Sequence, residues 1–189
     1  MILEGIVTTL NPDGSLNIAP MGPRVENAAC ERFVLRPYRS STTYRNLKRH
    51  GEGVLHVTDD VLLLTRAAIG PVTDEASGPA TKVNGRILLN SCRYHEFRVT
   101  SLDDLEDRVT IEAESVATGH LRDFFGLNRA KHAVVEAAIL ATRVALLPYD
   151  EIRAEYVKLA ILVEKTGGRE EHQAFALLHS YVNNHQSTI

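Results

Sequence analysis

The sequence predicts an α+β protein in which a block of strands precedes a block of helices. Segments rich in β-branched residues, separated by turn signals, fill the first two thirds of the chain. After Gly119 the pattern changes to long stretches with apolar residues at helical spacing. Runs of strands followed by runs of helices are typical of an α+β layout with a C-terminal helical part.

The opening of the chain predicts a β-hairpin, with strands at 2–10 and 15–21. The segment Asn11-Pro12-Asp13-Gly14 between them is a strong turn signal. Further strands are expected at 32–35, 54–58, 86–91, 93–101 and 108–118, with a loop from Thr73 to Gly85. Two short helices are expected between these strands: one from Thr43 to His50, capped by Ser41 or Thr42, and one through Ala68, capped by Asp59 or Asp60.

The last third of the chain predicts three helices. They are expected from Asn128 to Leu147, from Asp150 to about Thr166, and from Arg169 to about Asn184, with Pro148 and Gly167-Gly168 as breaks. The first helix carries a broad face of small residues, which favours close packing. We therefore expect it to pack between the strand-rich part and the other two helices, as part of a docked subdomain.

Composition excludes several classes of protein. The 189 residues include 21 Lys plus Arg and 24 Asp plus Glu, so the net charge of −3 argues against nucleic-acid binding. No apolar run approaches the roughly 18 residues of a membrane span. The N-terminus lacks a basic region before its apolar residues, so no export signal is predicted and a cytoplasmic location is expected. Cys30 and Cys92 lie too far apart in sequence to suggest a disulfide framework.

The segment from Arg36 to Leu47 is the most informative part of the chain. Four hydroxyl residues, Ser40 to Thr43, precede a helix start and are flanked by Arg36, Arg39 and Arg45. Free N–H groups at a helix start, hydroxyl donors and a guanidinium together form a cradle for a phosphate. The alternative is a well-capped helix with a solvated basic face.

The hairpin segment 13–22 is a second candidate. Ala19 and Gly22 would let a flat ligand approach the backbone, and Met21 offers a soft surface for an aromatic ring. The alternative is a plain hairpin that kinks at Pro20.

A third candidate is the start of the helix at Asn128. Arg129 and Lys131 place positive charge at the helix end that disfavours it. A phosphate, an acidic substrate or a nearby carboxylate such as Glu136 would compensate, and the last of these is a purely structural role.

Other chemistry finds little support in the sequence. Eight histidines show no convincing metal-ligand spacing, so no metal site is predicted. Cys92 beside Arg93 is better explained as a small packed side chain than as a reactive thiolate. A GxGxxG fingerprint, a Walker loop and a GxSxG elbow are all missing from the sequence.

The order of these motifs resembles the FMN-binding split β-barrel of flavin reductases and pyridoxamine-phosphate oxidases. The segments that carry the resemblance are NPDG, LNIAPMG, the Ser/Thr-rich turn into TYRNL, and VLHVTDD. Together with the C-terminal segment LNRAKHAVVEAAILATR, the chain resembles the archaeal and bacterial domain-of-unknown-function family 447. The resemblance implies a split barrel over 1–125, a helical subdomain over 126–189, bound FMN and a homodimer, with no catalytic residue assigned.

The resemblance also implies positions for the cofactor. It places the FMN phosphate at Arg39, Ser41, Thr42 and Thr43, and the ring edge along Ala19, Pro20, Met21 and Gly22. His56 would lie beside the ring, where a small amide is usual in the fold. Arg129 or Lys131 would reach the phosphate or a substrate anion.

Three functions are consistent with these features. The first is a flavin-dependent oxidoreductase or flavin reductase of unknown substrate. The second is a flavin carrier or sensor without turnover. The third is a binder of another phosphate-bearing ligand in the same cradle.

Overall fold

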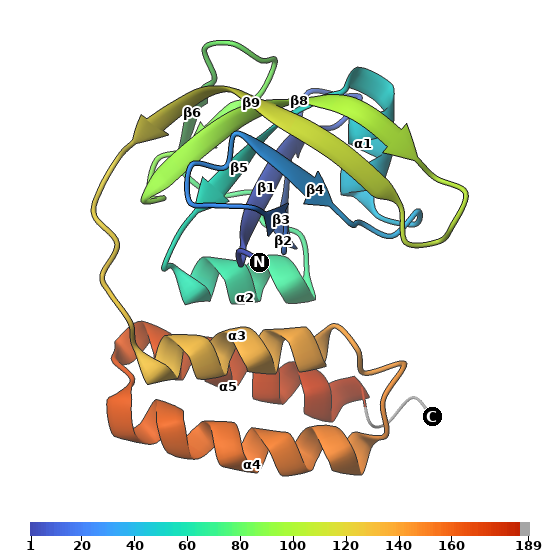
Figure 1. Cartoon of the computed structure of the whole chain (residues 1–189). Helices are drawn as coiled ribbons and strands as arrows, with labels where there is room; N and C mark the ends of the chain where they lie inside the picture. Colours follow the sequence, from blue (N-terminus) through green and yellow to red (C-terminus); the bar gives the residue numbers. More distant parts are fainter. Residues whose placement is uncertain (186–189) are drawn as a thin grey trace. The chain divides into compact units, whose positions relative to one another are not determined.

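A computed structural model describes residues 1–185 and divides the chain into two compact units. Unit 1 comprises residues 1–58 and 72–124, and unit 2 comprises residues 59–71 and the chain from Phe125 onward. Figure 1 shows the sheet of the first and the helices of the second. The expected boundary at residue 125 does not account for the helix after Asp60. That helix lies in unit 2 with the C-terminal helices.

Unit 1 is built on a curled antiparallel sheet of seven strands in the order β2-β1-β5-β8-β9-β4-β3. Every pairing within it is antiparallel. Its strands are β1 (Gly5–Leu10), β2 (Leu16–Met21), β3 (Arg24–Val25), β4 (Arg32–Leu35), β5 (Glu52–Val57), β8 (Arg93–Asp103) and β9 (Thr110–His120). A two-stranded sheet of β6 (Ser77–Pro79) and β7 (Arg86–Leu88) accompanies it.

The N-terminal residues connect the two ends of this sheet. Leu3 N donates to Pro23 O at 3.0 Å, and Val25 N donates to Met1 O at 2.9 Å. Residues 1–3 thus pair with the β3 end of the sheet, while β1 pairs with β2 at the other end. Two register shifts between β8 and β9 add to the curvature, since bulges increase local twist. The result is a partly closed barrel.

The barrel interior is filled by buried apolar side chains from six strands (β1, β3, β4, β5, β8 and β9) and one helix. Phe33 and Phe97 meet edge to face with ring centroids 5.3 Å apart. Leu47 of α1 (Thr42–His50) belongs to the same cluster, so α1 packs its apolar side into the barrel. Gly51 ends α1 at φ 68°, a left-handed conformation that favours glycine.

The described part of unit 2 is a bundle of four helices. They are α2 (Val61–Ile69), α3 (Arg129–Ala141), α4 (Tyr149–Thr166) and α5 (Arg169–His185). Helix α3 packs against the other three, and its small-residue face is fully buried: Ala130, Ala133, Val134, Ala137, Ala138 and Ala141 are at most 2% exposed. The expected packing of this helix against the two C-terminal helices, α4 and α5, is confirmed.

Some predicted bounds were wrong, and their causes are local. Helix α3 ends at Ala141 instead of Leu147, where the Thr142 hydroxyl bonds to Ile139 O and Arg143 N bonds three residues back to Leu140 O. The short strands β3 and β6 were not expected, because two or three residues carry no periodicity. The strands expected at 86–91 and 2–10 are shorter, at 86–88 and 5–10.

Within residues 1–185, no helix is both long and apolar enough to cross a membrane.

Candidate functional site

The start of α1 is a helix N-terminus that has a side-chain cap and no acidic residue in its first turn. Ser41 Oγ accepts a hydrogen bond from Tyr44 N at 3.2 Å, as the sequence predicted for one of the two candidate caps. The first turn contains no acidic residue, and Ser41 and Thr42 are both partly exposed. The first N–H groups of a helix have no partner within it, so this end favours an anion.

Arg45 supplies the cation at this helix start. Its guanidinium donates to Thr42 Oγ1 at 2.9 Å and to Ser40 O at 2.6 Å, which folds the side chain back over the first turn. The family resemblance implied Arg39 for this role, and the Arg39 side chain is also exposed. The signal for Arg45 was its spacing, because residues i and i+3 share a helix face.

Lys48 is engaged elsewhere and does not belong to this cluster. Its ammonium bonds to Asp104 Oδ2 at 2.6 Å, and the Tyr44 hydroxyl donates to the same oxygen. The bonds from Lys48 and Tyr44 lower the pKa of Asp104 to about 2, so this carboxylate stays charged at neutral pH. Asp104 therefore pairs with Lys48, while the side chains of Arg39 and Arg45 are exposed to solvent.

A buried polar network ties α1 to the hairpin. Thr43 is 2% exposed, and its hydroxyl accepts from Asn17 Nδ2 at 3.1 Å. Asn46, one turn further along α1, donates to Thr9 Oγ1 at 3.1 Å and to Asn11 Oδ1 at 2.9 Å. Thr43 is thus an internal anchor for the helix, while Ser41 and Thr42 remain at the surface.

The residues predicted to contact the ring come shortly after Asn17 along β2 and the turn that follows it. Ala19 lies two residues beyond Asn17 and therefore on the same face of the strand, about 7 Å further along it. Ala19, Pro20, Met21 and Gly22 are all partly exposed. A Cβ added at Gly22 would lie 3.0 Å from Ile2 Cγ2, so glycine permits the N-terminal segment to pass close by. The structure therefore brings the cradle and this segment together in unit 1.

The contacts of His56 are with backbone groups of neighbouring strands and do not match the ligand-binding role that was predicted for it. The side chain is fully buried, and its Nε2 accepts from Leu88 N at 3.0 Å. Its Nδ1 lies 3.3 Å from Ile6 O, so the proton sits on Nδ1 and donates to that carbonyl. Burial lowers the pKa of His56 to about 3. Both ring nitrogens thus connect β5 to its neighbours β1 and β7.

Lys131 is likewise engaged, by residues of its own unit. Its ammonium lies 2.8 Å from Glu171 Oε1 and donates to Asp59 O at 2.8 Å. This is the structural alternative considered for the helix-start cations, with Glu171 in place of Glu136. Arg129 is exposed at the first position of α3.

The donor set at α1 fits the phosphate of a mononucleotide. It offers backbone N–H groups, the hydroxyls of Ser41 and Thr42, and the guanidinium of Arg45, with Arg39 three residues before Thr42. Among residues 1–185 the structure shows no cluster of three or more histidine, cysteine or acidic side chains placed to hold a metal ion.

Comparison with solved structures finds the same fold in several proteins, some of them described as flavin proteins. An FMN-bound DUF447 protein from Methanosarcina mazei has a TM-score of 0.82 and 21% identity, over 95% of this chain and 94% of that one. The flavin reductase HpaC in complex with NADP+ has a TM-score of 0.56 and 22% identity, over 66% and 81%. Nitrilotriacetate monooxygenase component B from Bacillus cereus has 0.55 and 16%, over 65% and 71%. The predicted split-barrel fold is confirmed.

Comparison with curated protein sequences gave no match. Two family models do match, and together they span most of the chain. The N-terminal domain model of the protein of unknown function DUF447 matches residues 3–122, and its C-terminal counterpart matches residues 128–180. The chain therefore belongs to the DUF447 family.

Proposed function

We propose that this protein binds FMN and acts as a flavin-dependent oxidoreductase or flavin reductase. The observation that carries the proposal is the start of α1, where Ser41, Thr42 and Arg45 present donors to solvent beside β2. An anionic group at this point would be held by charge-assisted hydrogen bonds, which are the strong ones. We place the FMN phosphate at this helix start, with Arg39 as a second cation beside it.

The isoalloxazine ring is assigned to β2 and the turn that follows it. Asn17 fixes this strand to Thr43 of α1, so Ala19 and Met21 lie at defined steps from the phosphate cradle. A small side chain at Ala19 and the missing side chain at Gly22 leave the backbone open to a flat ligand. Met21 adds a polarisable surface for the ring.

The flavin, when bound, supplies the hydride or electron transfer itself. The residues of this chain would bind and orient it: Arg45 and the start of α1 would hold the phosphate end, and β2 would contact the edge of the ring. His56 and Lys131 are left out of this proposal, because both are already fully engaged by neighbouring residues.

Proteins of known structure with the same fold add support. One of them is an FMN-bound member of the same family, and others are a flavin reductase with NADP+ and a monooxygenase component. These descriptions belong to those proteins. They make FMN the first ligand to test in this cradle.

Titration of the purified protein with FMN and with riboflavin tests the cradle. We expect FMN to bind more tightly than riboflavin, because only FMN carries the phosphate. Arg45→Ala should weaken FMN binding about 10- to 100-fold, since hydrogen bonds to charged groups contribute about 1.5–3 kcal/mol each. Arg49→Ala, in the last turn of the same helix, is the matched control and should leave FMN affinity unchanged.

Addition of NADH or NADPH to the FMN-loaded protein tests turnover. Bleaching of the flavin absorbance followed by recovery in air supports an oxidoreductase or flavin reductase. A bound flavin that neither nucleotide reduces favours the second candidate, a carrier or sensor. A protein that binds inorganic phosphate at α1 but neither flavin would favour a different phosphate-bearing ligand.

We also propose that the protein is a homodimer. Twofold association is the commonest closed arrangement of identical chains. Within the described residues, several large apolar side chains of unit 2 are exposed, among them Val157 and Ile161. Light scattering at micromolar concentration tests the assembly, and a stable monomer would contradict it.

A further inference from the structure

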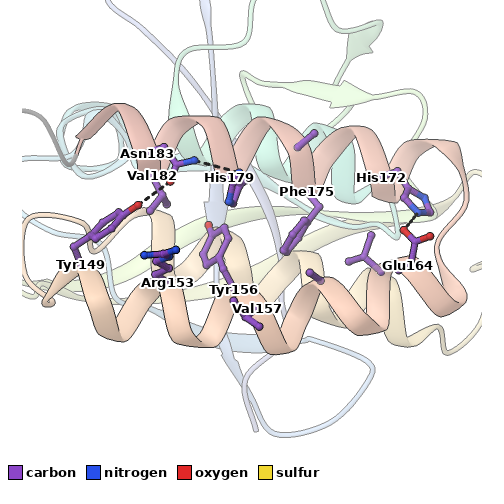
Figure 2. Close-up of a pocket in the computed structure, with 13 residues that line it drawn as sticks. Tyr149, Arg153, Tyr156, Val157, Glu164, His172, Phe175, His179, Val182 and Asn183 are labelled. Atoms are coloured by element: carbon purple, nitrogen blue, oxygen red, sulfur yellow. Dashed lines mark hydrogen bonds and ion pairs between the residues drawn. The ribbon is translucent and has the colours of Figure 1, made fainter.

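A groove runs along unit 2 between α4 and α5. Its volume is about 450 Å³, within the range of about 300–1,000 Å³ that is typical of small-molecule sites. Figure 2 shows Arg153 and Asn183 towards one end of the groove and Glu164 and His172 at the other. The lining between these ends is mainly apolar and aromatic. Sites for small molecules combine such a lining with a few polar groups that fix the orientation of the ligand.

The middle of the groove presents a row of aromatic rings. The ring centroids of Tyr156 and Phe175 are 5.4 Å apart, and the ring of His179 is 6.2 Å from that of Tyr156. The Tyr156 hydroxyl donates to Ala137 O at 2.7 Å, so this residue offers its ring and not its hydroxyl to a ligand. Aromatic pairs prefer centroid separations of about 4.5–7 Å. A further ring placed on this row would therefore find partners at both sides.

Two alanines leave the space for such a ring. Ala160 of α4 and Ala176 of α5 both line the groove. Beneath them Val163 and Val182 are each 3% exposed, so the floor is packed within unit 2 itself. A longer side chain at Ala160 would occupy part of the groove without disturbing this floor.

A chain of hydrogen bonds orients His179. The Tyr149 hydroxyl donates to Asn183 Oδ1 at 2.9 Å, and Asn183 Nδ2 lies 3.2 Å from His179 Nδ1. An amide NH₂ group only donates, so Nδ1 is the acceptor and the proton of the neutral ring is on Nε2. Among residues 1–185, Nε2 has no hydrogen-bond partner. Figure 2 shows the His179 ring extending from α5 towards α4, so this N–H is a donor available within the groove.

The two ends of the groove differ in charge. Arg153 is exposed and has no hydrogen-bond or ion-pair partner in the described part of the chain. At the opposite end the Glu164 carboxylate is 83% exposed, and its ion-pair partner His172, at 3.6 Å, is charged only when protonated. The Arg153 end therefore attracts an anion, and the Glu164 end repels one.

We infer that this groove binds a small aromatic monocarboxylate. Its carboxylate would lie between the Arg153 guanidinium and the His179 Nε2–H, and its ring would pack on Tyr156 and Phe175. Charge complementarity selects a single carboxylate, because a second one at the far end would meet Glu164. The site lies within unit 2 and is separate from the α1 cradle, so it does not depend on bound FMN.

Heteronuclear NMR of the full-length, FMN-free protein tests the inference with phenylpropionate as the probe. A ligand of this size should bind with a dissociation constant of about 1 mM or tighter. The resonances that shift should be those of α4 and α5. Phenylpropionamide, which lacks the charge, and octanoate, which lacks the ring, should each bind several-fold more weakly.

Substitutions separate the charge from the cavity. Arg153→Ala should weaken phenylpropionate about fivefold, as expected for one exposed ion pair, and should leave phenylpropionamide unchanged. Lys158→Ala is the matched control, because Lys158 is also on α4 and is 69% exposed but pairs with Glu155 outside the groove. This control should bind phenylpropionate as wild type does.

Ala160→Leu tests the cavity itself. It should weaken both aromatic probes about tenfold or more by filling the space that the ring would take, and leucine is a good helix former. Thermal melts of each variant check that unit 2 remains folded.

Three results would overturn the inference. The first is equal affinity for phenylpropionate in wild type and Arg153→Ala, and the second is tighter binding of octanoate than of phenylpropionate. The third is a set of groove resonances that shift with protein concentration when no probe is present, because a second copy would then cover the groove. FMN titration of the same samples reports the α1 cradle separately. Phenylpropionate binding at α4 and α5 in a protein that fails to bind FMN would count against the proposed function and support the groove.

Discussion

The Thr43 hydroxyl accepts a hydrogen bond from Asn17 Nδ2 at 3.1 Å, and this contact joins the first turn of α1 to β2. This contact gives Thr43 a different role from its neighbour Thr42. Thr43 is 2% exposed and faces the hairpin, whereas Thr42 is partly exposed and contacts Arg45. A direct side-chain contact therefore links the proposed phosphate cradle to the strand proposed for the ring.

The same substitution at these two residues should give opposite results. Thr42→Val removes a hydroxyl from the cradle and should weaken FMN binding about 10- to 100-fold, with little change in melting temperature. Thr43→Val removes the acceptor for Asn17 and should lower the free energy of unfolding by about 1 kcal/mol. Calorimetric titration and thermal melts of both variants measure the two effects. Full FMN affinity in Thr42→Val would remove Thr42 from the site.

Glu96 shows how the loop before β7 is held. The side chain is fully buried, and its carboxylate accepts from the backbone N–H groups of Thr81, Lys82 and Val83 and from the Thr81 hydroxyl. Burial raises the pKa of Glu96, but these hydrogen bonds outweigh it, so the net pKa lies below the ordinary value of 4.5. The carboxylate is thus a structural anion that fixes residues 81–83.

Glu96→Gln should destabilise unit 1. The amide of glutamine brings N–H donors to a place where only acceptors are useful, so the expected loss is about 1–3 kcal/mol. The lowered pKa means that the native contribution of Glu96 is present above about pH 4.5 and is lost as pH falls below it. Chemical unfolding at pH 7 and pH 4 should therefore show a smaller difference between variant and wild type at the lower pH. An equal difference at both would contradict the assigned cause.

His56 and His95 predict a second, milder acid sensitivity. Burial lowers the pKa of His56 to about 3 and that of His95 to about 4, against an ordinary 6.5. The unfolded chain binds protons at these sites before the folded chain does. Their contribution to stability is therefore complete above about pH 6.5 and falls as the pH drops towards 3–4, by at most about 1.4 kcal/mol per pH unit for each residue.

Replacement by phenylalanine distinguishes the two histidines. His56→Phe leaves the Leu88 N–H without its acceptor and should cost about 1–3 kcal/mol at pH 7. His95 is 3% exposed, and neither ring nitrogen has a hydrogen-bond partner among the described residues. His95→Phe should therefore be neutral or stabilising at pH 7 and should flatten the stability profile between pH 6.5 and 4. Unfolding curves across this range measure both effects, and a strongly destabilised His95→Phe would reveal a missing partner.

The sequence predicted the elements that have strong local signals. Ser41 was one of two expected caps, and the NPDG turn set the hairpin because its residues are pre-organised for a turn. The membership of α2 in unit 2 was not predicted, since a nine-residue apolar helix has no local feature that names its packing partner. Long-range packing decides such assignments.

The candidate site was predictable to a similar extent. The capping preference of hydroxyl residues placed Ser41, Thr42 and Thr43 at a helix start but did not show that Thr43 faces inward to Asn17. It also could not rank Arg39 against Arg45, because the direction of a long side chain depends on the neighbours it meets. His56 was assigned to a ligand through the fold resemblance, and Lys131 through its positive charge at a helix start together with that resemblance. Their partners, Leu88 and Glu171, lie 32 and 40 positions away in the sequence, beyond any local pattern.

The Lys131–Glu171 pair joins the start of α3 to the start of α5. The two side chains are 14% and 9% exposed, and Glu171 also accepts from Gly168 N at 2.8 Å. Burial raises the pKa of Glu171, but the bonds from Lys131 and Gly168 outweigh it, so the net pKa is lowered and the carboxylate is charged at neutral pH. Removal of the lysine would leave that charge buried without its cation.

Lys131→Met should therefore destabilise unit 2 by about 3–5 kcal/mol, whereas Lys131→Met with Glu171→Leu should recover most of the loss, because an apolar pair of similar volume replaces a buried ion pair at little cost. Arg129→Ala, at an exposed position two residues earlier, is the control and should change stability by no more than about 0.5 kcal/mol. Thermal melts measure these differences. The folded double variant also decides the role of Lys131 in ligand binding: it should bind FMN as tightly as wild type if the lysine serves only the helical bundle. A large loss of FMN affinity in that variant, with a normal melt, would return Lys131 to the cofactor site.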